Sequence, residues 1–458
     1  SLIIGEAQDF GCELLDAKGR QLAHSPRAMP VFSLTLPLAV QTMIERHPVD
    51  TLKPGDVLIT NDPWKCAGHL FDIAIVTPIF RDDRVVALAG NVGHVTDIGG
   101  TKNRLHAHDL YEEGLQIPPM KLVREGKINE DLIELITENV RSADQVIGDL
   151  HALISANAAG AERIHEFMEE YGMHDLEALA TVIQGRAERA MRSAIGDLRP
   201  GTYEGEIWNN SLDGKERFPI RLNVSSDEIE VDFAGAPDQH DRGAVNCTLS
   251  YTKAHAVYPL KCILSPEVPG NAGAYRPFQV KAPKGSILNC DKPMPVNMRT
   301  RTGWYIAPNI FNVMAEAAPD KVQAFTALPC NARFYGIGPD DRHYSDHLFQ
   351  GGGQGASAHG DGKSAVMFPT SAANTSIELF ESRVPMLVVE KAYVSDSGGA
   401  GRQRGGLGQV IVTRKLLDDA RPAQVGLYPN GVGVPTPGLF KGRAGAESRA
   451  WVRNDAGE

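Results

Sequence analysis

The sequence predicts an α+β protein of several domains, in which mixed β-sheets surround one helical segment. Apolar, β-branched runs separated by polar turns fill the N-terminal part, residues 129–200 repeat apolar residues with helical spacing, and strand patterns return afterwards. The 458 residues also exceed what one hydrophobic core ordinarily organises. We therefore expect four regions: residues 1–128 (α+β), 129–200 (helical), 201–330 (β-rich) and 331–458 (glycine-rich and β).

The N-terminal region begins with an expected strand over residues 1–16, in which Asp9 interrupts the alternation of apolar and polar residues. A short turn separates this strand from a return strand that begins at residues 21–23. Apolar residues at helical spacing predict a helix over 36–46, and the turn KPGD leads into a strand over 57–60.

Two apolar runs on either side of the charged segment RDDR predict a β-hairpin over residues 73–91. With Phe80 paired to Val85, His69 and His94 lie on one face at the open end of this hairpin, because side chains alternate faces along a strand. A register slip of one residue would separate the two histidines.

An aspartate follows each histidine by three residues, so that Asp72 and Asp97 also lie at this end. In a regular strand both point away from the histidines, but the nearby glycines permit a bulge that would bring either one back. Two imidazoles with a carboxylate suit a divalent metal such as Zn, Mn or Fe. The alternative is that these residues cap turns and bond to loops. Cys66 is either a further ligand or a thiol packed in a turn.

The stretch from Thr101 to Gly114 is polar and has no period, which is typical of an active-site loop. Each of its polar residues taken singly also fits a solvated loop. The candidate groups for contacting substrate or supporting the ligands are His106, His108, Asp109, Glu112 and Glu113.

Three amphipathic helical patterns fill residues 129–198, with Asn129 and Asp175 as predicted caps. The tripeptide RPG then marks a boundary before strand patterns. We expect strands over 202–210, 218–226 and 229–237, helices over 249–264 and 304–318, and an ordered loop, outside the core, over 266–297.

Two glycine-rich stretches occur in the last third of the chain, at residues 351–355 and 398–406. They either pack as tight turns or hold an anion through backbone N–H groups. Neither is a P-loop, because the pattern GxxxxGK[ST] does not occur in the sequence, and no strand–GxGxxG–helix unit is evident. The sequence therefore predicts no nucleotide site on this chain.

Composition excludes several classes of function. The net charge of −11 argues against a nucleic-acid partner, and no apolar run reaches the length of about 20 residues that a membrane span needs. The six cysteines are scattered without a CxxC pair, which favours reduced thiols and a cytoplasmic location. No basic-then-apolar segment opens the sequence, so we expect no secretory signal.

Ordered motifs along the whole chain resemble the hydantoinase B/oxoprolinase family. The family comprises B-type subunits of ATP-dependent hydantoinases, 5-oxoprolinases and caprolactamases, with acetone and acetophenone carboxylase subunits as relatives. The chain departs from the family pattern in having Cys66 and Ala67 before its Gly-His pair, and Val31 where a histidine is frequent. The motifs are NDPW, GHLFDI, GHVTDIGG, YEEGLQIPP, PGTYEGE, DFAGAPDQ, PGNAGAYRP, APKGSILN, GGGQGA and DSGGAGRQRGGLGQ.

The resemblance implies one divalent metal ion (Zn, Mn or Fe) held by His69, Asp72 and His94. It also implies an N-terminal aspartate ligand, for which Asp9 is the best match and Asp16 the reserve. His94 and Asp97 are the expected catalytic residues, with Asp97 orienting a histidine ligand or acting as general base.

The resemblance further implies a hydrolase that opens small cyclic amides and acts in a hetero-oligomer. A separate A-type subunit would bind ATP and phosphorylate the substrate, and this chain would complete ring opening at its metal. Two alternatives remain open: a subunit of a ketone carboxylase resembling acetone carboxylase, or a non-catalytic scaffold subunit.

Overall fold

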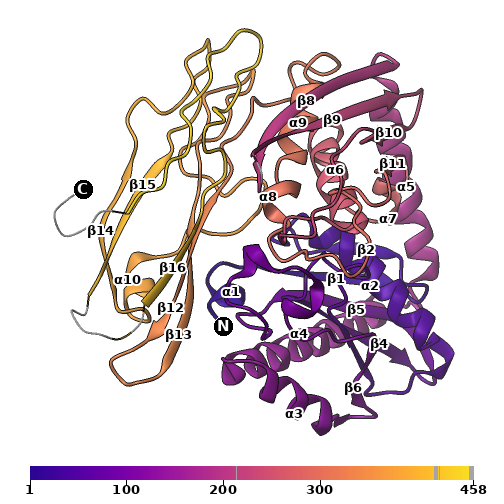
Figure 1. Cartoon of the computed structure of the whole chain (residues 1–458). Coiled ribbons are helices and arrows are strands. Elements are labelled where there is room, and N and C mark those ends of the chain that lie inside the picture. Colours follow the sequence, from indigo (N-terminus) through magenta and orange to yellow (C-terminus); the bar gives the residue numbers. More distant parts are fainter. Residues whose placement is uncertain (213, 417–420, 422, 453–458) are drawn as a thin grey trace. The chain divides into compact units, whose positions relative to one another are not determined.

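Figure 1 shows the computed structural model, which describes residues 1–212, 214–416, 421 and 423–452. The chain combines helices with several mixed sheets, so the α+β prediction is confirmed. It divides into two compact units. Unit 1 comprises Ser1–Glu206 and Phe218–Ile310, and unit 2 comprises Ile207–Arg217 and Phe311–Glu458. The division into four regions stays a prediction.

A seven-stranded antiparallel sheet forms the centre of unit 1, in the order β2-β1-β5-β4-β3-β6-β7. The predicted hairpin lies in its middle as β4 and β5. The first strand was placed too early, because residues before Phe10 form the short helix α1 (Leu2–Gly5) instead. The strands are β1 (Phe10–Asp16), β2 (Gln21–His24), β3 (Val57–Thr60), β4 (Asp72–Arg81), β5 (Arg84–His94), β6 (Met120–Arg124) and β7 (Lys127–Ile128).

Helices cover both faces of this sheet. Asn91 of β5 donates from its side chain to Leu153 O of α4 (Ala143–Glu170) at 2.6 Å. Its neighbour Gly90 faces the other way, where an added Cβ would lie 3.4 Å from Leu36 of α2 (Phe32–Arg46). Because alternate residues of a strand share a face, His94 lies on the same face as Gly90, against which α2 packs.

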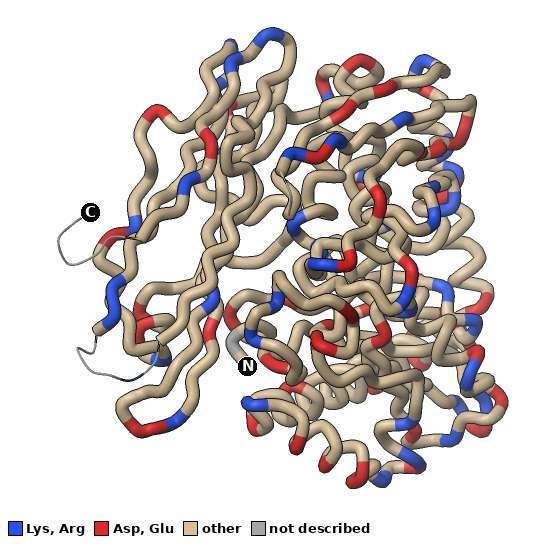
Figure 2. Tube along the Cα trace, viewed as in Figure 1, with Lys and Arg blue, Asp and Glu red and all other residues tan. Residues whose placement is uncertain are grey.

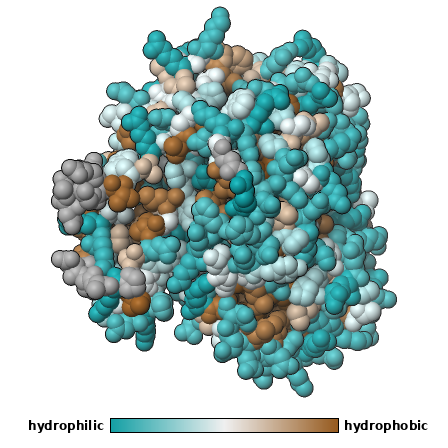
Figure 3. All heavy atoms as spheres, viewed as in Figure 1, coloured by the Kyte–Doolittle hydropathy of each residue, from teal (hydrophilic) through white to brown (hydrophobic). Residues whose placement is uncertain are grey.

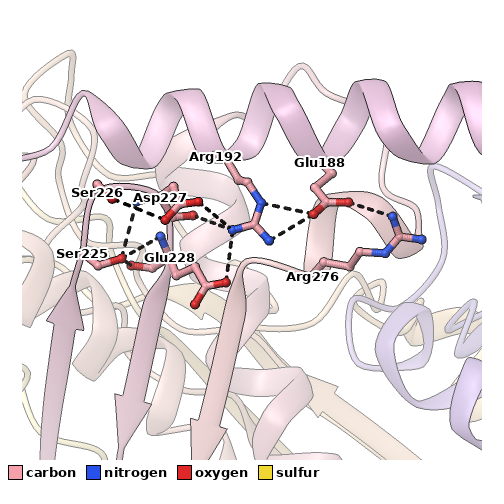
Figure 4. Close-up of polar contacts among 7 residues, drawn as sticks. All are labelled: Glu188, Arg192, Ser225, Ser226, Asp227, Glu228 and Arg276. Carbon is pink, nitrogen blue, oxygen red and sulfur yellow. Dashed lines mark hydrogen bonds and ion pairs between the residues drawn. The ribbon is translucent and has the colours of Figure 1, made fainter.

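The predicted helical segment is confirmed as α3 (Glu130–Asn139), α4 and α5 (Glu177–Gly196). Asn129 caps α3 by accepting from Leu132 N, as predicted. The network in Figure 4 joins α5 to its surroundings: Arg192 bonds to Glu188, Asp227 and Glu228, and Glu188 in turn accepts from Arg276. Through these bonds α5 anchors the turn before β10 and the end of α7 (Ala272–Tyr275).

A second, four-stranded sheet has the order β11-β10-β9-β8. It contains the three predicted strands, but the third ends at Asp232 and not at residue 237. The prediction that 266–297 is only loop was wrong in part. Residues 278–281 form β11, which pairs with β10 in parallel, and a parallel pair between distant segments leaves no turn signal. Cys290 and Val296 also belong to the core. These strands are β8 (Gly201–Ser211), β9 (Gly214–Val224), β10 (Ile229–Asp232) and β11 (Phe278–Lys281).

Helix α6 (Leu249–Leu264) has the predicted bounds, and Thr248 caps it by accepting from Tyr251 N. The helix expected over 304–318 is shorter, and spans α9 (Ile306–Met314). Unit 1 also contains the short helix α8 (Thr300–Gly303) and the 3-10 turns Val49–Thr51, Arg104–His106 and Leu110–Glu112.

Unit 2 contains a three-stranded sheet, β13-β12-β16, and a two-stranded sheet, β14-β15. Its glycine-rich stretches pack backbone against backbone: an added Cβ at Gly353 would collide with Gly406 O, and one at Gly355 with Ala324 O. These approaches fit the predicted tight turns. The elements are β12 (Cys330–Ile337), β13 (His343–Gln350), α10 (Ile377–Glu381), β14 (Met386–Tyr393), β15 (Gln409–Lys415) and β16 (Ala423–Tyr428).

Charged and apolar residues are mixed over the surface. Acidic and basic residues are interspersed along the chain in Figure 2, and the face drawn in Figure 3 is largely hydrophilic with scattered apolar patches. Among the described residues, no helix combines the length and the apolar character that crossing a bilayer requires.

Asn61 fixes the loop between β3 and β4. Its side chain, which is fully buried, donates to Leu70 O at 2.7 Å and Leu115 O at 3.0 Å and accepts from Ile117 N at 2.6 Å. It therefore ties the segment before β4 to the segment before β6.

We expect Asn61→Ala to lower the free energy of unfolding by about 3 kcal/mol, because two buried backbone groups and one partly buried group lose their partner. Chemical denaturation measures this change. Asn139→Ala is the matched control: Asn139 is exposed, and within the described part of the chain its side chain bonds only to Leu135 O in the preceding turn of its own helix. Equal effects of the two substitutions would contradict the role of Asn61.

Candidate metal centre

The candidate centre lies at the open end of the central hairpin. Asp72 is the first residue of β4 and pairs directly with His94, the last residue of β5. His69 reaches the same place from the loop before β4, where Gly68 has a φ of +87°. Three side chains from two strand ends therefore converge.

The observed register corrects the predicted one. Phe80 pairs with Val85 as predicted, but Ile79 pairs with Ala87, so Val86 is an extra residue in the ladder. From this bulge onward the register is displaced by one residue. The regular hairpin had directed Asp72 away from the histidines, whereas the bulge places it opposite His94, on the same face.

The three side chains present their ligand atoms to one another. Asp72 Oδ1 lies 2.8 Å from His69 Nε2 and 3.1 Å from His94 Nδ1. One ligand atom from each residue falls within 4.8 Å of the other two. All three residues are buried, and Phe71 packs against both imidazoles with ring centroids 5.5–5.6 Å apart.

Asp9 lies beside this cluster, as predicted for the N-terminal ligand. Its Oδ2 is 3.7 Å from His94 Nδ1, and its backbone oxygen accepts from His94 N at 3.0 Å. The reserve candidate, Asp16, is the last residue of β1, where it accepts from Arg20. The structure therefore brings Asp9, and not Asp16, to the histidines.

Burial and neighbouring charges set the protonation of these groups. Burial, reinforced by Arg299, lowers the pKa of His69 to about 3. Burial alone would raise the pKa of Asp72, but His69 and Arg299 outweigh it and hold this carboxyl ionised. Burial raises the pKa of Asp9 to about 6, against the opposing effect of His94. A neutral imidazole beside an ionised carboxylate is the state that binds a metal.

The lack of hydrogen bonds to the His69 ring from residues that the structure describes favours a cation-binding role for this side chain. Although His69 Nε2 lies 2.8 Å from Asp72 Oδ1, neither ring nitrogen makes a hydrogen bond of acceptable geometry within the described residues. Because hydrogen bonds weaken steeply with misalignment, the short distance does not make His69 and Asp72 a hydrogen-bonded pair. Lone pairs that converge in this way fit a divalent ion of the Zn, Mn or Fe type.

Asp97 is not brought to the histidines. Its carboxylate accepts from the backbone N–H of Arg141, from Arg141 Nη1 at 2.9 Å and from Gly99 N at 3.4 Å. This placement favours a role in ordering the turn after β5, and the catalytic role of Asp97 stays a prediction. Cys66 also lies outside the cluster: burial raises the pKa of its thiol, whose Sγ lies 3.9 Å from Asp72 O.

The polar stretch after β5 divides into surface and buried groups. His106, His108 and Glu112 are exposed, and Asp109 accepts from Glu112 N in a local turn. Glu113 is buried and accepts from two backbone N–H groups, and burial raises its pKa to about 8. Glu113 alone among the five predicted candidates is therefore buried.

Sequence reasoning missed Arg299 and Tyr251. Arg299 Nη2 donates to Asp72 Oδ2 at 2.8 Å, and its guanidinium lies 4.4 Å from the centre of the Tyr251 ring. Both residues are buried and come from segments far along the chain. Neither carries a local motif, and the one signal nearby is Gly68, whose backbone leaves room for both.

Comparisons with known proteins agree with the sequence motifs. A family model described as hydantoinase B/oxoprolinase matches residues 1–458. An uncharacterized protein from Methanocaldococcus jannaschii is 30% identical over 99% of this chain and 80% of its own length. The B-type subunit of a putative D-/L-hydantoinase from Pseudomonas sp. is 29% identical over 91% of this chain and 74% of its own length.

Two solved structures share the fold. An ATP-dependent caprolactamase from Pseudomonas jessenii matches 90% of this chain and 73% of its own, with a TM-score of 0.81 and 27% identity. A nucleotide-free acetone carboxylase matches 94% of this chain and 60% of its own, with a TM-score of 0.82 and 19% identity.

We expect the purified protein to bind about one equivalent of a divalent transition metal, and His69→Ala or His94→Ala to lose it, because each removes one of few ligands. Elemental analysis after dialysis against a weak chelator measures the content. His151→Ala, at an exposed position of α4, is the control and should retain the metal. Retention by all three variants would contradict the assigned ligands.

Proposed function

Since the chain belongs to the hydantoinase B/oxoprolinase family, we propose that it is the metal-containing B-type subunit of an ATP-dependent enzyme that hydrolyses cyclic amides. It would act with a separate A-type subunit that binds ATP. The observation that carries this proposal is the convergence of His69, Asp72 and His94 in a buried cluster whose nitrogen and oxygen atoms suit a divalent cation.

The named relatives support the class of reaction and the need for a partner. One is named as the B-type subunit of a hydantoinase, and another, from Pseudomonas jessenii, as the beta chain of a caprolactamase. Hydantoins and caprolactam both contain a cyclic amide. We therefore propose a small cyclic amide as substrate, activated by ATP on the partner subunit.

Each residue of the cluster would have its own role in binding the metal. His69 and His94 offer neutral nitrogens, Asp72 offers an ionised oxygen, and Asp9 is placed to contribute a second carboxylate. A divalent cation held there would supply Lewis acidity and lower the pKa of water. Phe71, packed on both imidazoles, shields one side of the cluster from solvent.

ATP could assist the hydrolysis of a cyclic amide by activating the substrate. An amide carbon is a poor electrophile, and phosphorylation of its oxygen on the partner subunit would make it more reactive. This chain would then need to position the activated ring and deliver water to it. The geometry assigns no general base to that last step. Asp97 remains the predicted general base.

A carboxylase is the second candidate, because the acetone carboxylase structure shares this fold. At 19% identity this likeness concerns the fold alone. The ligand set by itself fits both an amidohydrolase and a carboxylase. Incorporation of labelled bicarbonate into a ketone by the assembled complex would favour the carboxylase over the amidohydrolase.

We expect His69→Ala and His94→Ala to reduce turnover of cyclic amides by the reconstituted complex more than a hundredfold, since even outer partners of metal ligands cost about 10–100-fold. ATP-dependent ring opening, followed by chromatography of the product, measures the rate. His151→Ala provides the comparison at an exposed site.

Full activity of the metal-free complex would instead indicate a scaffold role for this chain. It would also remove the reason for assigning the two histidines to the reaction.

A further inference from the structure

Arg299 binds the oxygen of Asp72 that does not face the histidines. We propose that Arg299 is the positioning residue of the metal centre, which fixes Asp72 so that a single carboxylate oxygen faces both imidazoles. This inference rests on the metal centre proposed above, but concerns a residue that the sequence motifs do not include.

The two oxygens of Asp72 have separate partners. Oδ2 accepts from Arg299 Nη2 at 2.8 Å, whereas Oδ1 faces His69 Nε2 and His94 Nδ1. A carboxylate that bound a cation through both oxygens would have to release the guanidinium. Arg299 therefore restricts Asp72 to one coordinating oxygen, which leaves more of the coordination sphere open, as catalytic metal sites require.

The guanidinium is itself held in place by contacts on three sides. Its Nε donates to Ala67 O at 3.0 Å, its Nη2 donates to Asp72, and its plane lies over the Tyr251 ring at 4.4 Å. A planar group with several fixed donors can satisfy these contacts together, whereas a lysine ammonium has one nitrogen for all of them. The contact with Ala67 also links Arg299 to the loop that carries His69.

The glycine before His69 is explained by the same packing. An added Cβ at Gly68 would lie 2.9 Å from Tyr251 Cβ and 3.1 Å from Arg299 Cδ, and the φ of +87° already favours glycine. A larger residue before His69 would therefore collide with Arg299 and Tyr251. In this Gly-His motif the histidine is a proposed ligand, and the glycine makes room for the positioning group.

Glu113 fixes the backbone segment that precedes Arg299. Its Oε1 accepts from Val296 N and Asn297 N, both at 2.7 Å, and Arg299 N bonds back to Val296 O at 3.0 Å. The turn before α8 is thus anchored to the polar stretch that follows β5. Arg299 is consequently held at its backbone as well as at its side chain.

A second arginine–aspartate pair provides a matched control. Arg141 binds Asp97, the aspartate of the other His-x-x-Asp motif, at 2.9 Å. Asp97 lies outside the three converging residues, so this pair should stabilise its turn without affecting the metal.

The test is a Co²⁺ titration of the metal-free protein, followed by its visible absorption, with thermal unfolding of each metal-free variant alongside. We expect Arg299→Met to weaken Co²⁺ binding by about 10–100-fold, the range for partners of metal ligands. The Co²⁺ absorption bands should also change, since a freed Asp72 alters the coordination geometry. Arg141→Met should bind Co²⁺ as the wild type does.

Arg299→Lys keeps a positive charge beside Asp72 and serves if the methionine variant does not fold. It should show altered bands and an intermediate affinity, because one ammonium cannot reproduce all the contacts. Unchanged affinity and absorption in either folded Arg299 variant would overturn the positioning role while leaving the metal centre intact. Absence of Co²⁺ binding by the wild type would instead overturn both the inference and the proposed function.

Discussion

A buried carboxylate is the constraint around which unit 1 is arranged. Asp72 is fully buried, and an ionised group without water is costly unless charges or hydrogen bonds replace its hydration. His94 and Arg299 supply this compensation, from a strand end and a distant turn. The bulge at Val86, the left-handed Gly68 and the ring of Tyr251 all serve the same geometry.

The sequence predicted what local patterns encode. The hairpin, the helices of the segment 129–200 and the bounds of α6 follow from periodicity, turns and caps that lie within a few residues. The register is displaced by one residue, yet the two histidines still meet, because His69 lies in the loop before β4 and not on the strand. The bulge left no such signal, because an extra residue in a ladder of apolar side chains changes neither length nor composition noticeably. The sequence therefore allowed a bulge that turns Asp72 toward the histidines, but did not place it at Val86.

Arg299 could not be found in the same way. It lies 227 residues after Asp72, and its neighbours Thr300 and Arg301 resemble any polar helix start. Strand β11 was missed through a similar separation, since its parallel partner is reached by a long connection. The family resemblance predicted the ligands, but a motif describes residues close in sequence, whereas the support behind them is assembled in three dimensions.

The separation between Asp72 and Arg299 has a consequence for how the centre forms. The hairpin closes a short loop, so the two strand ends can meet early, while the contact with Arg299 closes a loop of more than two hundred residues and is expected to come late. Until then Asp72 is a carboxylate flanked by imidazoles and accessible to water. The ligands would thus come together before they reach their final orientation. A chain still emerging from the ribosome would have its ligands close together, but without Arg299 to orient Asp72.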